Sequence, residues 1–179
     1  MGMDVEIMSP RKNTANPNLL TPSELHSINS WISSMKKWEN KGNYSKVTMA
    51  KRTLRLRYRF LGKGYTRIVY DMGKNYVLKV ALSDLGLKCN KTECEIFTHS
   101  PPDIKKNLCP VIQYGNGWII MKKIPNKVPD NNRFNNQILQ LQNKFISHGI
   151  IPNDFKKANL AFSKEQILTV IDYGNFIQN

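Results

Sequence analysis

The stretch RLRYRFLGKGYTRIVYDMGKNYVLKVA, residues 55–81, decides the fold through the spacing of its apolar residues. From Arg55 to Gly62, charged and apolar side chains alternate, as they do in a strand with one exposed face. Two more strands are predicted over Tyr65–Asp71 and Tyr76–Ala81, with a turn between them. The stretch therefore predicts the first part of a β-sheet.

The remainder of the chain adds helices before and after this stretch. Thr21-Pro-Ser-Glu24 is a capping sequence, and the apolar spacing that follows predicts a helix over residues 22–39. Further helices are predicted over 45–51, 88–98 and 134–147, and further strands over 110–114, 117–122, 160–162 and 167–171. This order predicts an α+β fold with a five-stranded sheet and one inserted helix.

We expect the chain to divide into three parts. Residues 1–20, rich in Asn, Pro, Ser and Lys, are predicted to form a flexible arm. Residues 21–54 are predicted to form a helical N-terminal extension, and residues 55–179 the main domain. Within that domain a first lobe would cover about 55–124 and a much reduced second lobe about 125–179.

The chain is strongly basic, with 27 Lys and Arg against 13 Asp and Glu and a net charge of +14. Residues 1–60 and residues 61–179 each contribute +7, so the excess does not sit in a tail. Such a surface attracts nucleic acid, anionic membranes or acidic proteins, but a plain solvated face explains it as well. We expect no nucleic-acid partner, because no recognised motif is present and the arginines at 52, 55, 57 and 59 alternate as on a solvated strand.

The cysteines and the N-terminal residues indicate in which cellular compartment the protein is expected. Cys89, Cys94 and Cys109 are odd in number and show no Cys-x-x-Cys spacing, which favours small apolar roles in a reducing compartment. No apolar run approaches membrane-spanning length, and the N-terminal residues show no charged-then-apolar signal pattern. Glu6 replaces the Ser or Thr that a myristoylation signal requires. We therefore expect a cytoplasmic protein, in its own cell or in a host, with no membrane span.

Two motifs near the end carry groups suited to phosphoryl transfer: Asp154-Phe-Lys-Lys-Ala-Asn159, and Asp172-Tyr-Gly174 after an apolar run. Asp154 is predicted to accept the proton of a hydroxyl nucleophile, and Lys156 to neutralise the transferred phosphoryl group. Asn159 and Asp172 are predicted to hold Mg²⁺ against nucleotide phosphates. Each motif alone is also compatible with loop caps and turns.

Three upstream elements complete the pattern. Gly62 and Gly64 lie at a predicted turn, where glycine lets backbone N–H groups approach phosphate oxygens. Lys79 lies within an apolar strand, where it would either sit at an edge or pair with an anion. Glu93 and Glu95 both offer that anion, and we favour Glu93 because it shares a helix face with apolar residues.

In this order and spacing, the motifs resemble those of the protein-kinase-like superfamily, over about Arg55 to Gly174. The resemblance implies a small lobe of five strands and one helix, a linker near Met121–Pro125 and the beginning of a helical lobe. It implies ATP and Mg²⁺ in the cleft between them, with the adenine against the linker at Met121. Lys79 and Glu93 then match the nucleotide-binding pair of the family.

The chain also departs from the family pattern. Arg67 stands where a third glycine is usual, so the phosphate loop is expected to be stiffer or held by a salt bridge. Pro152-Asn-Asp154 replaces His-Arg-Asp, and the activation segment with its Ala-Pro-Glu motif is absent. In this the chain is similar to reduced kinase-like proteins of bacteriophages and of bacterial effectors.

Two functions remain after this comparison. The first is a minimal Ser/Thr kinase that uses ATP and Mg²⁺ to phosphorylate a protein of a host or another partner. The alternative is a kinase-like binding module that inhibits or redirects a partner protein without phosphorylating it.

Overall fold

The computed structural model describes residues 18–178, so most of the predicted flexible arm lies outside the described residues. The end of that arm is not loose, because Leu20 is buried in the core and the backbone N–H of Leu19 donates to Oε1 of Gln113 over 3.0 Å. The ordered extension therefore begins earlier than residue 21.

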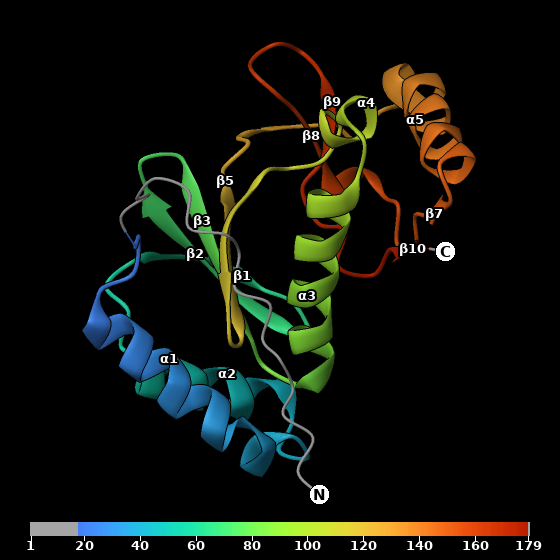
Figure 1. Ribbon diagram of the computed structural model, residues 1–179. Helices are drawn as coiled ribbons and strands as arrows, with labels where there is room; N and C mark the ends of the chain where they lie inside the picture. Colours follow the sequence, from blue (N-terminus) through green and yellow to red (C-terminus); the bar gives the residue numbers. More distant parts are fainter. Residues whose placement is uncertain (1–17, 179) are drawn as a thin grey trace, which may run out of the picture.

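A five-stranded antiparallel sheet forms the centre of the molecule (Figure 1). Its strands are β1 (Arg59–Lys63), β2 (Arg67–Gly73), β3 (Tyr76–Ala81), β4 (Val111–Gly115) and β5 (Trp118–Lys122), in the spatial order β1-β2-β3-β5-β4. Short turns join β1 to β2, β2 to β3 and β4 to β5, and the step from β3 to β4 contains the inserted helix. The predicted α+β class and the five-stranded sheet are confirmed.

The first strand was predicted too early. Helix α2 (Asn43–Leu54) runs on to Leu54, beyond the predicted end at residue 51, and Arg55 ends it in the left-handed conformation with φ of 46°. Strand β1 starts only at Arg59, opposite Asp71 of β2. Residues 55–58 therefore form the connection between α2 and β1. Their alternation of charged and apolar side chains does not reflect pairing with β2, which starts only at Arg59.

The helical extension covers one face of the sheet (Figure 1). Helix α1 (Pro22–Ser34) starts with the predicted capping box of Thr21 and Glu24, and a 3₁₀ turn, η1 (Met35–Trp38), continues it. Its apolar stripe and that of α2 form a core with every second residue of β2, β3 and β5: Ile28, Trp31, Val47, Ala50, Leu54, Ile68, Tyr70, Leu78, Val80, Trp118 and Ile120. The extension thus supplies half of the buried residues of the core on this face.

Helix α3 (Asp84–His99) covers the opposite face, and the short α4 (Pro102–Lys105) follows it. It begins four residues before the predicted helix because Ser83 caps it, accepting a hydrogen bond from the backbone N–H of Gly86. Alternate residues of β5, Ile119 and Met121, join Ile96 of α3 in a second core. Two separate cores therefore lie on the two faces of one sheet.

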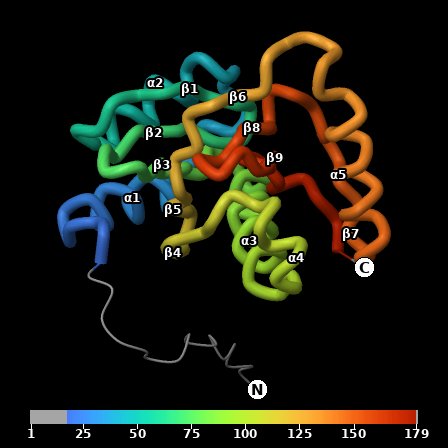
Figure 2. Tube along the Cα trace, turned by 90° about the horizontal axis from the view of Figure 1, so that it is seen from above, coloured from blue at the N-terminus to red at the C-terminus, as the bar shows by residue number. Residues whose placement is uncertain are grey.

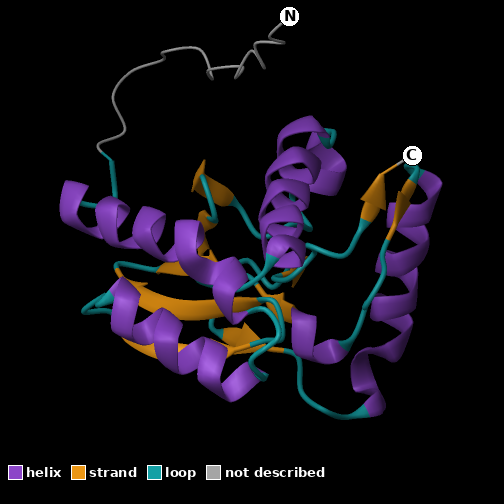
Figure 3. Cartoon of the chain, turned by 90° about the horizontal axis from the view of Figure 1, so that it is seen from below, coloured by secondary structure: helices purple, strands orange, loops and turns teal. Residues whose placement is uncertain are grey.

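The C-terminal part adds a helix and short strands to the second core (Figure 3). It comprises β6 (Asn126–Lys127), η2 (Asn132–Phe134), α5 (Asn135–Ser147), β7 (Ile150–Ile151), η3 (Lys157–Asn159), β8 (Leu160–Phe162), β9 (Leu168–Val170) and β10 (Ile177–Gln178). Leu141 and Phe145 of α5 pack into that core. The pairing of β10 with β7 was not predicted, since both strands have only two residues.

Each helix within residues 18–178 is too short or too polar to span a lipid bilayer. Cys89, Cys94 and Cys109 are in no disulfide; Cys89 and Cys109 are buried and Cys94 is half-buried, which agrees with the small apolar roles predicted for them.

Candidate functional site

Lys79 is placed in the site by the alternation of β3. Leu78 and Val80 face the extension, so Lys79 points to the other face, toward α3. There its Nζ lies 2.7 Å from Oε1 of Glu93, and both side chains are buried. Glu95 is exposed and pairs with Lys91 instead. The predicted choice of Glu93 over Glu95 agrees with this geometry.

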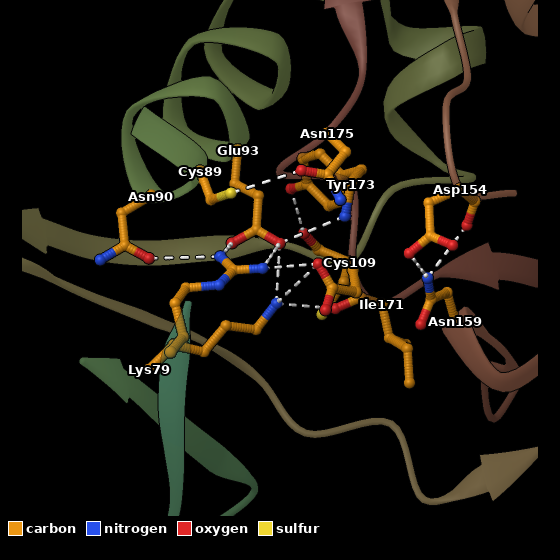
Figure 4. A network of polar contacts seen from close by, with 12 residues as sticks. Lys79, Cys89, Asn90, Glu93, Cys109, Asp154, Asn159, Ile171, Tyr173 and Asn175 are labelled. Atoms are coloured by element: carbon orange, nitrogen blue, oxygen red, sulfur yellow. Dashed lines mark hydrogen bonds and ion pairs between the residues drawn. The ribbon is translucent and has the colours of Figure 1, made fainter. Parts of the chain in front are cut away.

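The Asp172-Tyr-Gly174 segment docks directly on this pair (Figure 4). Lys79 Nζ donates to the carbonyl oxygen of Ile171 over 3.0 Å, and the N–H of Tyr173 donates to Oε1 of Glu93 over 3.2 Å. Asp172 Oδ1 lies 4.0 Å from Lys79 Nζ. The Tyr173 ring is buried, and its hydroxyl donates to the carbonyl of Cys109 over 2.7 Å. Residues nearly a hundred positions apart therefore meet in one polar network.

Arg67 is the central residue that sequence reasoning did not place. Its guanidinium lies 2.6 Å from Oε2 of Glu93 and 2.5 Å from Oδ1 of Asp172, and it also donates to Oδ1 of Asn90. The expected salt bridge at this position exists, but its two partners were not foreseen. The available signal was strand register: Val69 lies opposite Lys79, so Arg67, two residues away, shares its face.

The network contains two cations, Arg67 and Lys79, and two carboxylates, Glu93 and Asp172. Partial burial alone would raise the pKa of Asp172, but the charges of Lys79 and Arg67 outweigh it and hold that pKa below its ordinary value. Asp172 is therefore a carboxylate at neutral pH, with one oxygen already engaged by Arg67.

Gly174 is required by close packing. A Cβ at this position would lie 2.6 Å from Cβ and 3.0 Å from Cα of Cys89, and 3.1 Å from Nη2 of Arg67. Helix α3 thus approaches the backbone of the segment so closely that only glycine fits. The last residue of the motif has a packing role whatever its part in chemistry.

The Asp154 loop is held by its own residues. Asp154 has a left-handed backbone, with φ of 57°, which is uncommon for a residue with a side chain. Asn159 Nδ2 donates to Oδ2 of Asp154 over 3.2 Å and to its backbone carbonyl over 3.0 Å. Lys156 Nζ lies 2.9 Å from Oδ1 of the same carboxylate. The structure therefore brings together the three predicted residues of this loop, on an exposed surface.

The other predicted residues lie at the sheet. The N–H of Gly64 donates to the carbonyl of Arg67 over 2.9 Å, which closes the turn between β1 and β2. A Cβ on Gly62 would meet nothing within 4 Å, so packing does not demand glycine there. Met121 is completely buried within β5, so the linker starts after Lys122 and not at Met121.

The two predicted Mg²⁺ ligands, Asn159 and Asp172, lie on two stretches of backbone that are hydrogen-bonded to each other. The N–H of Ile171 donates to the carbonyl of Asn159 over 2.8 Å, which places Asp172 one residue from that contact. An amide oxygen and a carboxylate, completed by phosphate oxygens, make a donor set that suits Mg²⁺. No group of three or more His, Cys, Asp or Glu side chains within residues 18–178 could hold a metal by itself. The residues therefore fit Mg²⁺ only together with a phosphate-bearing ligand.

The Glu93 network and the Asp154 loop lie apart from a hollow on the surface of the molecule. One hollow of about 470 Å³ is lined by residues of β6, η2, α5 and β8, among them Lys127, Phe134 and Phe162. None of the predicted site residues lines it. The candidate site is consequently defined by converging polar groups and not by this hollow.

Comparison by sequence finds no matching family model and no matching curated protein. Comparison by structure finds solved structures of WbdD, described as a bifunctional kinase-methyltransferase. A high-resolution WbdD structure gives a TM-score of 0.56 at 18% identity and covers 68% of this chain. Monomeric WbdD gives 0.55 at 14% identity and covers 87% of it.

These likenesses concern the fold alone, because the identities are low. The chain spans 33% and 57% of the two WbdD chains, so it corresponds to only part of each. The molecule is an α+β protein with an antiparallel five-stranded sheet, and its neighbours support a kinase-like fold and nothing more specific.

Proposed function

We propose that this protein binds ATP with Mg²⁺ and transfers the γ-phosphoryl group to a Ser or Thr hydroxyl of a partner protein. The observation that carries the proposal is the single network in which Lys79 pairs with Glu93 while the Asp172 segment docks on both. A buried lysine with a buried glutamate is costly unless the geometry serves a purpose, and here it orients Lys79 beside Asp172.

Each residue then has a separate part in the transfer. Lys79 binds nucleotide phosphates, and Asn159 and Asp172 hold Mg²⁺, which supplies charge neutralisation when bound. Asp154 accepts the proton of the attacking hydroxyl, and Lys156 offsets charge on the phosphoryl group. The loop already holds Asp154 by hydrogen bonds, so its carboxylate is oriented before any substrate arrives.

The test is the transfer of labelled γ-phosphate from ATP–Mg²⁺ to the protein itself or to a mixture of proteins. Asp154→Asn is expected to lower the rate by about 10²- to 10⁴-fold. Asp130→Asn removes another exposed carboxylate, outside the site, and serves as the matched control. Full activity in the Asp154→Asn or Asp172→Asn protein would refute the proposal.

A second candidate is a binding module that does not transfer phosphate. It is favoured by the contact of Arg67 with Asp172, because this guanidinium engages an oxygen that Mg²⁺ would need. Calorimetric titration with ATP–Mg²⁺ separates the two candidates. Binding with no detectable transfer would favour the module; binding with transfer that depends on Asp154 would favour the kinase.

A further inference from the structure

One segment is rich in basic residues, most of which the proposed function does not use. Between Asn40 and Tyr70 the chain has nine Lys and Arg and no Asp or Glu. Arg67 is committed to the buried network and Arg59 pairs with Asp71. The other seven belong to α2, to the loop before it and to the connection into β1 and its turn. Seven cations are therefore gathered on α2, β1 and the connections beside them.

The fold gathers exposed aromatic rings among these cations. Helix α2 lies beside β1 (Figure 2), and lysines stack over rings across this contact. Lys51 Nζ lies 3.5 Å from the ring centre of Phe60, and Lys63 Nζ lies 5.9 Å from that of Tyr44. Tyr44 and Tyr65 are 79% and 78% exposed. Aromatic side chains this exposed bury little apolar surface in the fold, so their rings remain accessible to a ligand.

Lys46 is the unusual member of the group. It is only 5% exposed, and its Nζ lies 5.7 Å from the ring centre of Tyr65. Within residues 18–178 no carboxylate forms an ion pair with it, and its ammonium group has no hydrogen-bond acceptor. Its Nζ is not wholly enclosed, so the stem of the side chain is buried while the ammonium group reaches the surface. The charge of Lys46 is therefore suited to an anion that comes from outside the chain.

We propose that Tyr44, Lys46, Lys63 and Tyr65 form a binding site for single-stranded nucleic acid. The tyrosine rings stack on bases, while Lys46 and Lys63 contact backbone phosphates. This combination of ring faces and cations is how proteins hold single strands without reading their sequence. The sequence alone predicted no nucleic-acid partner, because it contains no recognised motif and its arginines alternate as on a solvated strand. It did not indicate that the fold brings aromatic rings beside the lysines of this segment.

Single strands suit this surface better than other polyanions do. The apolar side chains of α2, such as Val47 and Leu54, are buried against the sheet and unavailable for insertion into a membrane. An acidic protein segment would use the cations but would leave two exposed tyrosine rings unused. A duplex hides its base faces, so only its phosphates would be bound.

The binding experiment uses fluorescence anisotropy of the full chain with a labelled 12-nucleotide oligo(dT) or oligo(U). The same titration is repeated with a 12-base-pair duplex, with inorganic polyphosphate and with vesicles containing anionic lipid. We expect saturable binding of the single strands, tighter than that of the duplex or of polyphosphate. Lys46→Met is expected to reduce the dependence of log K on log salt by about 0.7, the value for one phosphate contact on a single strand.

Paired variants separate stacking from charge. Replacing both Tyr44 and Tyr65 by Ala is expected to weaken single-strand binding by at least about fivefold for each ring. Replacing both by Phe keeps the rings and should retain the affinity. Lys88→Met removes an exposed charge of α3, on the other side of the sheet, and is the control for Lys46→Met. Ultraviolet crosslinking should attach the oligonucleotide at Tyr44 or Tyr65.

Three results would overturn the proposal. The first is equal binding of single strand, duplex and polyphosphate, which would indicate charge alone. The second is unchanged affinity in the variant with Ala at both positions. Both tyrosines are exposed, so this variant should fold like the wild type. The third is binding of anionic vesicles that is lost in these variants while the oligonucleotides do not bind, which would assign the surface to a membrane.

Discussion

The buried network around Glu93 and the exposed loop around Asp154 are two halves of one candidate site, built in opposite ways. The network joins β2, β3, α3 and the segment after β9, with its central carboxylate wholly enclosed. The loop joins residues at most five positions apart and remains exposed. The first exists only if the whole fold exists, whereas the second is held by local contacts.

This difference implies that the two halves respond differently to mutation. A change in the network should act mainly on stability, because charges there have no water to replace a lost partner. A change in the loop should act mainly on function, because water can solvate what remains. The following variants test this contrast, in order of their expected effect on the free energy of unfolding.

Glu93→Ala should have the largest effect. It leaves the buried Lys79 and Arg67 with the half-exposed Asp172 as their remaining carboxylate partner, and it removes the acceptor of the Tyr173 N–H. We expect a loss of about 3–5 kcal/mol in the free energy of unfolding, measured by urea denaturation. Glu95→Ala, on an exposed face of the same helix, should change it by less than about 0.5 kcal/mol. Equal losses in the two variants would contradict the contrast.

Gly174→Ala should have the next largest effect. The added Cβ would lie 2.6 Å from Cβ of Cys89, so α3 or the Asp172 segment must move. Overpacking of this kind costs about 1–3 kcal/mol. Gly62→Ala is the matched control, because its Cβ meets nothing within 4 Å and its stability should be nearly unchanged. If nucleotide phosphates bind beside Gly62, that control should still lose part of the thermal shift produced by ATP–Mg²⁺.

Asp172→Asn should alter the dependence of stability on pH. The pKa of Asp172 is lowered in the folded chain, so its ion pairs stabilise the fold above the ordinary carboxyl pKa of 3.8 and are lost as the pH falls further. Wild-type stability should therefore decline below about pH 3.8, and that of Asp172→Asn should decline less steeply. Denaturation curves between pH 2 and pH 5 measure the slopes. Asp130→Asn should keep the wild-type slope.

Asp154→Asn should have the smallest effect on stability. The carboxylate is half-exposed and its partners lie in its own loop, so we expect a change within about 1 kcal/mol. The same variant is the one expected to abolish most phosphoryl transfer. A stable but inactive protein would confirm that this half of the site is separable from the fold.

Much of the fold could be predicted from local sequence. The capping box at Thr21, the bounds Tyr76–Ala81 of β3 and the bounds Leu160–Phe162 of β8 follow from hydrogen-bonding side chains and from the alternation of apolar residues. Glu93 was favoured over Glu95 because two residues that are two positions apart on a helix do not share a face, so only one of them can face the sheet. These features depend on neighbours in the chain, and such neighbours are visible in the sequence.

Other features depended on residues far apart. The partners of Arg67 lie 26 and 105 positions away, and no local pattern indicates which carboxylates they are. The burial of Leu20, the β7–β10 pair and the extension of α2 to Leu54 have the same origin, since each is decided by packing against a distant segment. Local preference alone could not have selected them.

The sequence by itself determined the α+β class, the order of the elements and the residue types of the candidate site, because periodicity and spacing are properties of the chain. Only the tertiary structure decided that Arg67 binds both Glu93 and Asp172, that Gly174 has no room for a side chain and that exposed tyrosines stand among the lysines of α2 and β1. The physical reason is that strand register and helix packing bring distant charges and rings within a few ångströms, where their interactions become strong.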